Sequence, residues 1–104
     1  MANKKIDSDE GVIVALCRDY ARRSAAISAG KMPRRVLMEY AYLNKRIFEG
    51  AGEIVGGVLS EVFINDIGNR IGYASSGVEL MSESTYKRYK SAAIKNIARK
   101  LYLA

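Results

Sequence analysis

The sequence predicts a single all-α domain, residues 1–104, with about four main helices. Three observations favour this fold class. Apolar residues recur every three or four positions over four stretches, as in amphipathic helices. Residues that start and stop helices stand between those stretches. The length of 104 residues suits one domain with one core, and no internal repeat or long linker divides it.

The first predicted helix follows Asp7-Ser8-Asp9, residues typical of a helix N-terminus, and stops at Gly30. We expect Arg18, Arg22 and Arg23 on its outer face. The positions that repeat at helical spacing are Val12, Leu16, Tyr20, Arg23 and Ile27, with Ile13 and Val14 beside them.

Pro33 suits the first position of a second helix, which we expect to end near Gly56-Gly57. Because only a few residues separate the two helices, they should lie antiparallel as a hairpin within residues 1–57. Gly50 and Gly52 either weaken the end of the second helix or let another helix approach closely. The apolar side of this helix comprises Val36, Leu37, Tyr40, Leu43, Ile47, Ala51 and Ile54.

The pattern of residues 58–104 predicts two more helices. The third runs from about Leu59 to Ile71 and stops at Gly72. Ala74–Met81 shows no period and is expected to be a loop, with a short turn or extended piece at Val78 to Leu80. The last helix follows the N-cap candidates of residues 82–85. Its apolar seam comprises Tyr86, Tyr89, Ala93, Ile97 and Leu101.

The side-chain inventory argues against an enzyme or a metal protein. The chain has no His and one cysteine, Cys17, which excludes an internal disulfide, a Cys/His zinc site and a Ser-His or Cys-His nucleophile pair. Catalysis by carboxylates or Lys stays formally open, but the acidic residues do not cluster. We therefore expect no catalytic residue, no metal and no cofactor, and we expect Cys17 to be buried and inert.

The localisation and the class of partner follow from hydropathy and charge. No apolar run approaches the roughly 20 residues needed to span a bilayer, and no signal-peptide stretch opens the chain. These features predict a cytoplasmic protein with no membrane partner, and nothing in the sequence indicates a small-molecule substrate. The net charge of +6 indicates a polyanionic partner.

The positive charge is concentrated near the C-terminus. Residues 82–104 carry six basic side chains and one acidic one, out of 17 Lys and Arg and 11 Asp and Glu in the chain. A helix with one core face and one basic face suits contact with phosphates, although such a face can also merely keep a small protein in solution. The basic face comprises Lys87, Arg88, Ser91, Lys95 and Arg99.

From Phe63 onward the sequence resembles a helix-turn-helix. In that motif a buried apolar residue is followed by a small residue where two helices cross, another apolar residue and a turn glycine. The residues that match in order are Ile67, Gly68, Ile71 and Gly72.

Residues 82–90 resemble the recognition helix of the same motif. A Ser caps the segment, Thr85 lies near the backbone, and Tyr86 and Tyr89 fill inward apolar sites. The arrangement is similar to the C-terminal domain of sigma factors and to phage-type transcriptional regulators of the ArpU kind. Those regulators pair an N-terminal helical region with such a motif.

This resemblance covers about residues 62–101 and implies a DNA-binding transcriptional regulator of bacterial or phage origin. It would read double-stranded DNA with the helix that starts near Ser82. Symmetric dimers are common among such proteins, and the hairpin offers a surface for a homodimer. The expected DNA contacts are Lys87, Arg88, Lys90 and Lys95 to phosphates, Ser82, Ser84 and Thr85 at the helix entrance, and Arg70 as an extra backbone contact.

The chain departs from the family pattern between Tyr73 and Ser82. Eight residues, Ala74 to Met81, stand where the pattern allows almost none. Either they form an ordered, elongated turn that keeps the helix crossing, or the two helices do not meet as the motif demands. The alternative function is a helical protein-interaction or structural module that docks a partner through its apolar hairpin face, without nucleic-acid binding.

Overall fold

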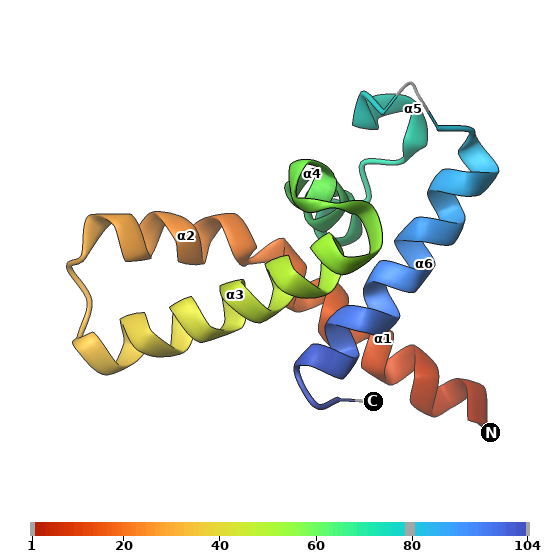
Figure 1. Ribbon diagram of the computed structural model, residues 1–104. Coiled ribbons are helices and arrows are strands. Elements are labelled where there is room, and N and C mark those ends of the chain that lie inside the picture. Colours follow the sequence, from red (N-terminus) through yellow and green to blue (C-terminus); the bar gives the residue numbers. More distant parts are fainter. Residues whose placement is uncertain (1, 79–80, 104) are drawn as a thin grey trace.

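The computed structural model describes residues 2–78 and 81–103, with side chains from Glu10 onward, and this part of the chain is helical with no strand. The all-α prediction is therefore confirmed (Figure 1). Within the described residues, no helix has the length and apolar character to cross a bilayer. The helices are α1 (Ala2–Arg18), α2 (Tyr20–Ala29), α3 (Arg34–Val55), α4 (Gly57–Asn69), α5 (Tyr73–Ser76) and α6 (Glu83–Lys100).

The first predicted helix is in fact two helices. Helix α1 begins at Ala2, so Asp7-Ser8-Asp9 lies inside it and does not cap it. Asp19 separates α1 from α2, although no Gly or Pro marks this break. Gly30 ends α2 as predicted, in the left-handed conformation with φ of 65°, and its N–H donates to the carbonyl of Ala26.

Helix α2 and the first half of α3 lie antiparallel and form a hairpin arm, residues 20–43, that projects from the rest of the chain (Figure 1). Arg23 lies at its base and is only 3% exposed, so its predicted place on the outer face is wrong. Its Nε donates to Oδ1 of Asn44 at 2.7 Å, and a second guanidinium nitrogen donates to the Leu16 carbonyl. Between residues 24 and 43 no side chain is fully buried.

The core lies where α1, α3, α4 and α6 meet. On α1 the buried face includes Ile13, whereas Val12 of the predicted seam is 44% exposed. Helix α6 packs chiefly on α3, and a Cβ at Gly50 would lie 2.7 Å from the Cα of Ile97. Gly50 therefore permits the close approach of another helix, one of the two roles expected for it. The buried cluster comprises Ile13, Cys17, Ile47, Ala51, Ile64, Ile67, Ala93, Ile97 and Ala98.

Gly68 of α4 lies against α1 and not against α6. A Cβ at this position would be 2.4 Å from the backbone nitrogen of Arg18 and 2.6 Å from the carbonyl carbon of Cys17. The Nε of Arg18 also donates to the Gly68 carbonyl at 3.3 Å. The small residue of the motif thus permits a crossing of α4 with α1 at the α1–α2 break. Of the two alternatives left open by the insertion, the structure has the one in which Gly68 does not meet the helix after Ser82, because α1 occupies that side of α4.

The segment between α4 and α6 is partly helical. Arg70 ends α4 in the left-handed conformation with φ of 55°, and Gly72 follows with φ of 83°. Helix α5 occupies the start of the expected loop, and the Tyr73 hydroxyl donates to the carbonyl of Met81. Of the short piece predicted at Val78 to Leu80, residues 79 and 80 lie outside the described residues. The described part of the insertion is therefore packed against the beginning of α6.

Candidate nucleic-acid interface

The orientation of α6 on α4 is set by Asp66, a buried acid that the sequence analysis did not single out. Its carboxylate accepts hydrogen bonds from the Tyr86 hydroxyl at 2.6 Å, the Gly72 N–H at 2.9 Å and Nζ of Lys90 at 3.1 Å. Burial raises the pKa of Asp66, but these three hydrogen bonds outweigh that effect and hold the pKa below its ordinary value. Asp66 therefore joins α4, the turn after it and α6 in one network.

Tyr86 is buried as predicted, and Tyr89 is not. The ring of Tyr86 stacks on Phe63 with ring centres 4.5 Å apart and meets the ring of Tyr73 edge-on at 5.4 Å. Tyr89 is 40% exposed, so its predicted inward site is wrong. The buried side of α6 runs through Tyr86, Ala93 and Ile97, and Tyr89 stands at its edge. One tyrosine of the pair therefore belongs to the core and the other to the surface.

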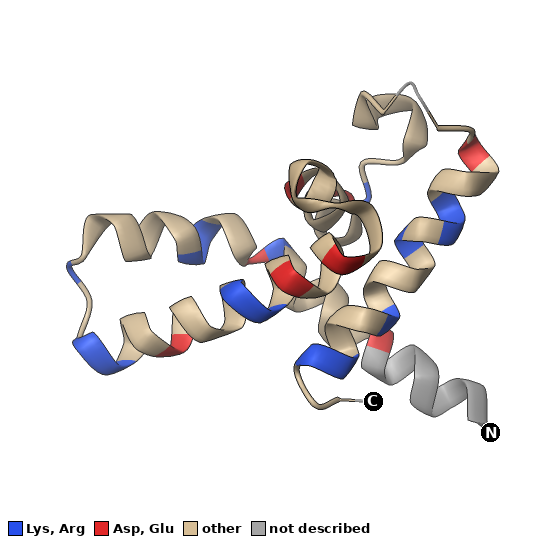
Figure 2. Cartoon of the chain, in the orientation of Figure 1, with Lys and Arg blue, Asp and Glu red and all other residues tan. Residues whose placement is uncertain are grey.

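The opposite side of α6 carries the basic residues. Figure 2 shows Lys and Arg along α6 and the hairpin arm, with Asp and Glu around the end of α3 and the start of α4. All five residues predicted for the outward side are exposed, in agreement with the helical-wheel prediction. We call this set the α6 basic face: Lys87, Arg88, Ser91, Lys95 and Arg99.

The N-terminus of α6 is capped by Ser82, as predicted. The Ser82 hydroxyl accepts a hydrogen bond from the Thr85 N–H at 3.3 Å and donates to Oγ1 of Thr85 at 2.9 Å. The hydroxyl of Ser84 lies 3.4 Å from that of Ser82. The structure thus brings together the three hydroxyl residues expected at the helix entrance.

The predicted basic contacts differ in how far they are already engaged. Lys87 pairs with Glu83 at 3.0 Å, but both side chains are largely exposed, so a phosphate can replace Glu83 at small cost. Lys90 is half-buried and directed toward Asp66. Arg88 and Lys95 form no ion pair with the described residues. Arg70 lines a groove of about 350 Å³ beside α6 together with Lys90.

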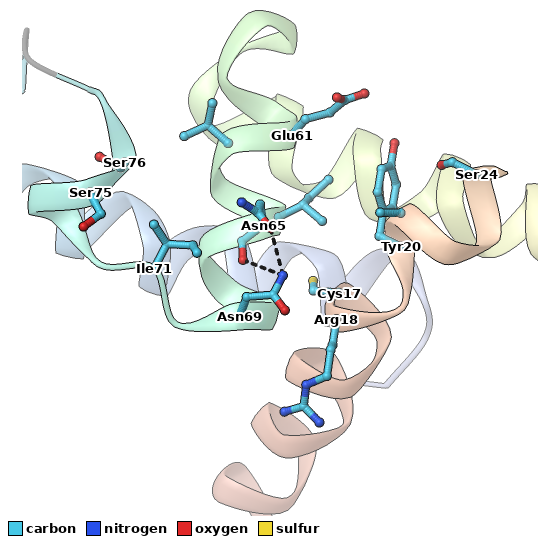
Figure 3. Close-up of a pocket in the computed structure, with 13 residues that line it drawn as sticks. Cys17, Arg18, Tyr20, Ser24, Glu61, Asn65, Asn69, Ile71, Ser75 and Ser76 are labelled. Atoms are coloured by element: carbon cyan, nitrogen blue, oxygen red, sulfur yellow. Dashed lines mark hydrogen bonds between the residues drawn. The ribbon is translucent and has the colours of Figure 1, made fainter.

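A separate cleft of about 510 Å³ lies between the α1–α2 break, α4 and α5 (Figure 3). Burial raises the pKa of the Cys17 thiol at its edge to about 12, so this sulfur stays protonated at neutral pH. The Asn69 amide donates to Oδ1 of Asn65 at 2.8 Å, and Glu61 is the one carboxylate among the lining residues. The cleft therefore offers neither a thiolate nor a pair of carboxylates.

Comparison of the chain with protein families, with characterised proteins and with solved structures found no match. The functional conclusion therefore depends on the geometry and charge of α6. Six of the eight predicted contact residues are exposed, and Thr85 and Lys90 are half-buried. The exposed six are Arg70, Ser82, Ser84, Lys87, Arg88 and Lys95.

Proposed function

We propose that this protein binds double-stranded DNA, with α6 facing the duplex, and acts in transcriptional regulation. One observation carries the proposal: the α6 basic face is exposed from Lys87 to Arg99, while the opposite side of the same helix is buried on α3, α1 and α4. The helix can therefore meet a duplex without leaving the core. An α-helix fits the major groove, and Lys and Arg on its flank neutralise phosphates.

The finer arrangement that we propose is a modified helix-turn-helix, in which α4 supports α6 through Asp66 and not through a crossing at Gly68. The contact of Asp66 with Tyr86 and Lys90 supports it, because it holds the first half of α6 at a fixed angle to α4. In this arrangement α5 is the elongated turn. The hydroxyls of Ser82 and Ser84 at the start of α6 would meet the phosphate backbone, and Arg88 and Lys95 would follow it along the groove.

The test is a salt titration of affinity for duplex DNA. The double variant Arg88→Ala/Lys95→Ala removes two exposed charges of the α6 basic face. Arg34→Ala/Arg35→Ala removes two equally exposed charges at the far end of the hairpin arm and is the matched control. We expect the first variant to lower the steepness of the log–log plot by about 1.8, at about 0.9 per phosphate, and the control to leave it unchanged.

Two results would contradict DNA binding through α6. One is the absence of binding to duplex and single strands near physiological salt. The other is an equal loss of affinity in the two double variants, because non-specific attraction to net charge does not depend on where the charge lies.

The hairpin arm supports a second proposal, a homodimer. Its side chains between residues 24 and 43 are at most half-buried, and Met38 is 62% exposed. A second copy would cover this apolar surface with a self-complementary contact. Sedimentation equilibrium of the wild type and of Met38→Glu measures it: we expect a dimer that the substitution weakens, and a monomer at all concentrations would contradict it. A chain that binds no DNA but docks another protein here would be the interaction module instead.

A further inference from the structure

We infer that Arg46 of α3 and Arg99 of α6 form an additional phosphate-binding site at the C-terminal end of α6. Its ligand is the phosphodiester backbone of a DNA duplex, contacted without regard to base sequence. The inference depends on the proposed DNA binding and extends it from one helix to two. It is carried by two observations: the setting of Arg46 beside two tyrosine rings, and the positive charge of the cavity that Arg46 lines with Arg99.

The Arg46 guanidinium lies close to two tyrosine rings. Its guanidinium carbon lies 5.3 Å from the ring centre of Tyr42, one turn earlier on α3, and 5.8 Å from that of Tyr102, just after α6. Arg46 forms no ion pair with the described residues. The two neighbouring rings restrain the guanidinium, and a restrained side chain loses less freedom when it binds a ligand. A paired contact with two phosphate oxygens fits the N–H groups of a guanidinium.

Tyr102 takes the left-handed position of the cap that ends α6. Its φ is 61°, in the left-handed region, at a helix end where glycine is usual. The Tyr102 N–H donates to the Arg99 carbonyl at 3.1 Å, and the Leu103 N–H donates to the Ala98 carbonyl at 2.8 Å. These two hydrogen bonds close the cap and account for the left-handed conformation, and the side chain is 77% exposed. The cap places the Tyr102 ring beside Arg46, with the ring centre 5.8 Å from the guanidinium carbon.

The two arginines line one cavity of about 300 Å³ with a net positive charge. Arg46, Arg99 and Lys100 contribute three positive charges to its lining and Glu53 one negative charge. Glu53 is already engaged, since Lys100 forms an ion pair with it and the Asn96 amide donates to it at 2.9 Å. Arg46 and Arg99 therefore remain to meet an anion.

The cavity continues the α6 basic face. Lys95 and Arg99 are four residues apart and lie one above the other on the exposed side of α6. Arg99 also lines the cavity with Arg46. A DNA strand that follows the α6 basic face toward the C-terminus would therefore reach Arg46 next.

The experiment measures duplex affinity of the full chain against salt for Arg46→Ala, with Lys45→Ala as the matched control. Lys45 is the exposed neighbour of Arg46 on α3 and carries the same charge. Loss of one phosphate contact should lower the steepness of the log–log plot by about 0.9, so that the affinity ratio of wild type to variant falls about 3.5-fold between 50 and 200 mM salt. Lys45→Ala should leave the steepness unchanged.

Tyr102→Gly tests the site in a second way, by comparing its effect on stability with its effect on DNA affinity. Glycine removes the backbone strain and the ring together, so this variant should melt at a higher temperature than the wild type and yet bind duplex DNA more weakly. A variant that is more stable and binds equally well overturns the role assigned to Tyr102 and with it the site.

The remaining outcomes separate this inference from the proposed function. If Arg88→Ala/Lys95→Ala flattens the salt dependence but Arg46→Ala does not, the additional site is refuted and DNA binding by α6 stands. If the wild type binds no duplex, both fail. If Arg46→Ala weakens binding of polyglutamate but not of DNA, the site takes an acidic protein segment and the inference is overturned.

Discussion

Substitution of Asp66 by Ala should remove a large part of the stability of this protein. The change leaves the hydroxyl of Tyr86, a residue that is 1% exposed, without its acceptor, and the Gly72 N–H loses its partner as well. Lys90 loses its carboxylate as well, although its side chain reaches water. Each buried polar group left without a partner costs about 1 to 3 kcal/mol, so for the Tyr86 hydroxyl and the Gly72 N–H together we expect the free energy of unfolding at pH 7 to fall by about 4 kcal/mol. A domain of this size has about 5 to 15 kcal/mol in total.

Two further variants test the physical cause. Asp66→Asn keeps the shape and an oxygen that can accept from Gly72 and Lys90 but removes the charge, so it should cost about 2 kcal/mol. Tyr86→Phe removes the buried hydroxyl itself. In that background Asp66→Ala should cost at least about 1 kcal/mol less than in the wild type, because no hydroxyl is left unsatisfied.

The hydrogen bonds of Asp66 also make the stability of the fold depend on pH, with lower stability at low pH. The folded pKa of Asp66 lies below its unfolded value, so the carboxylate stabilises the fold fully above the unfolded pKa of about 3.9 and loses this effect as the pH falls through the folded pKa. Urea unfolding followed by circular dichroism at pH 7 and pH 3 measures it. The wild type should lose more stability between these two values than Asp66→Asn. A cost below about 1 kcal/mol for Asp66→Ala at pH 7, or parallel pH profiles, would refute the reasoning.

Three other predictions concern α1, α4 and the start of α6. Gly68→Ala should destabilise the protein by about 3 kcal/mol in urea unfolding, since the backbone of Arg18 leaves no room for a methyl group there. Gly11 faces open space on α1, so Gly11→Ala should stabilise the protein by up to about 1 kcal/mol. A Gly68→Ala variant that is more stable than Gly11→Ala would contradict this packing. Cys17 should react with a disulfide reagent only as fast as the protein unfolds, because burial raises its thiol pKa to about 12, and rapid labelling of the folded protein would show otherwise. Ser82→Ala should cost about 1 kcal/mol through the lost cap, and an unchanged melting temperature would speak against that cap.

The features predicted correctly are those set by neighbouring residues. Ser82 begins α6 because its hydroxyl reaches a backbone N–H three residues away, and Gly30 ends α2 because glycine adopts a left-handed conformation without strain. The exposed side of α6 follows from the 3.6-residue period in the same way. Each of these signals lies within one or two turns of the residue that shows it.

The features predicted wrongly depend on contacts between distant segments. The break at Asp19 coincides with the crossing of α1 by Gly68, a contact between residues 50 apart, and nothing near Asp19 announces it. Arg23 occupies an apolar position of its helix, but its charge suggested the surface, because its partner Asn44 lies on another helix. Asp66 was overlooked for the same reason: its three donors come from the turn after α4 and from α6. The position of Asp66 between Ile64 and Ile67, which are apolar, was the one sign in the sequence that this acid is buried.

Helix α3 belongs to two environments at once. It is one uninterrupted helix of 22 residues, about 33 Å long. Its residues 34–43 include no buried side chain, whereas its second half includes the completely buried Ile47 and Ala51. Amide protons at its two ends should therefore exchange with solvent by different routes, through local opening of the arm at one end and only through unfolding of the whole domain near Ala51. We therefore expect the arm to open as a separate cooperative unit, and opening at its tip should leave the contact of α6 with Gly50 intact.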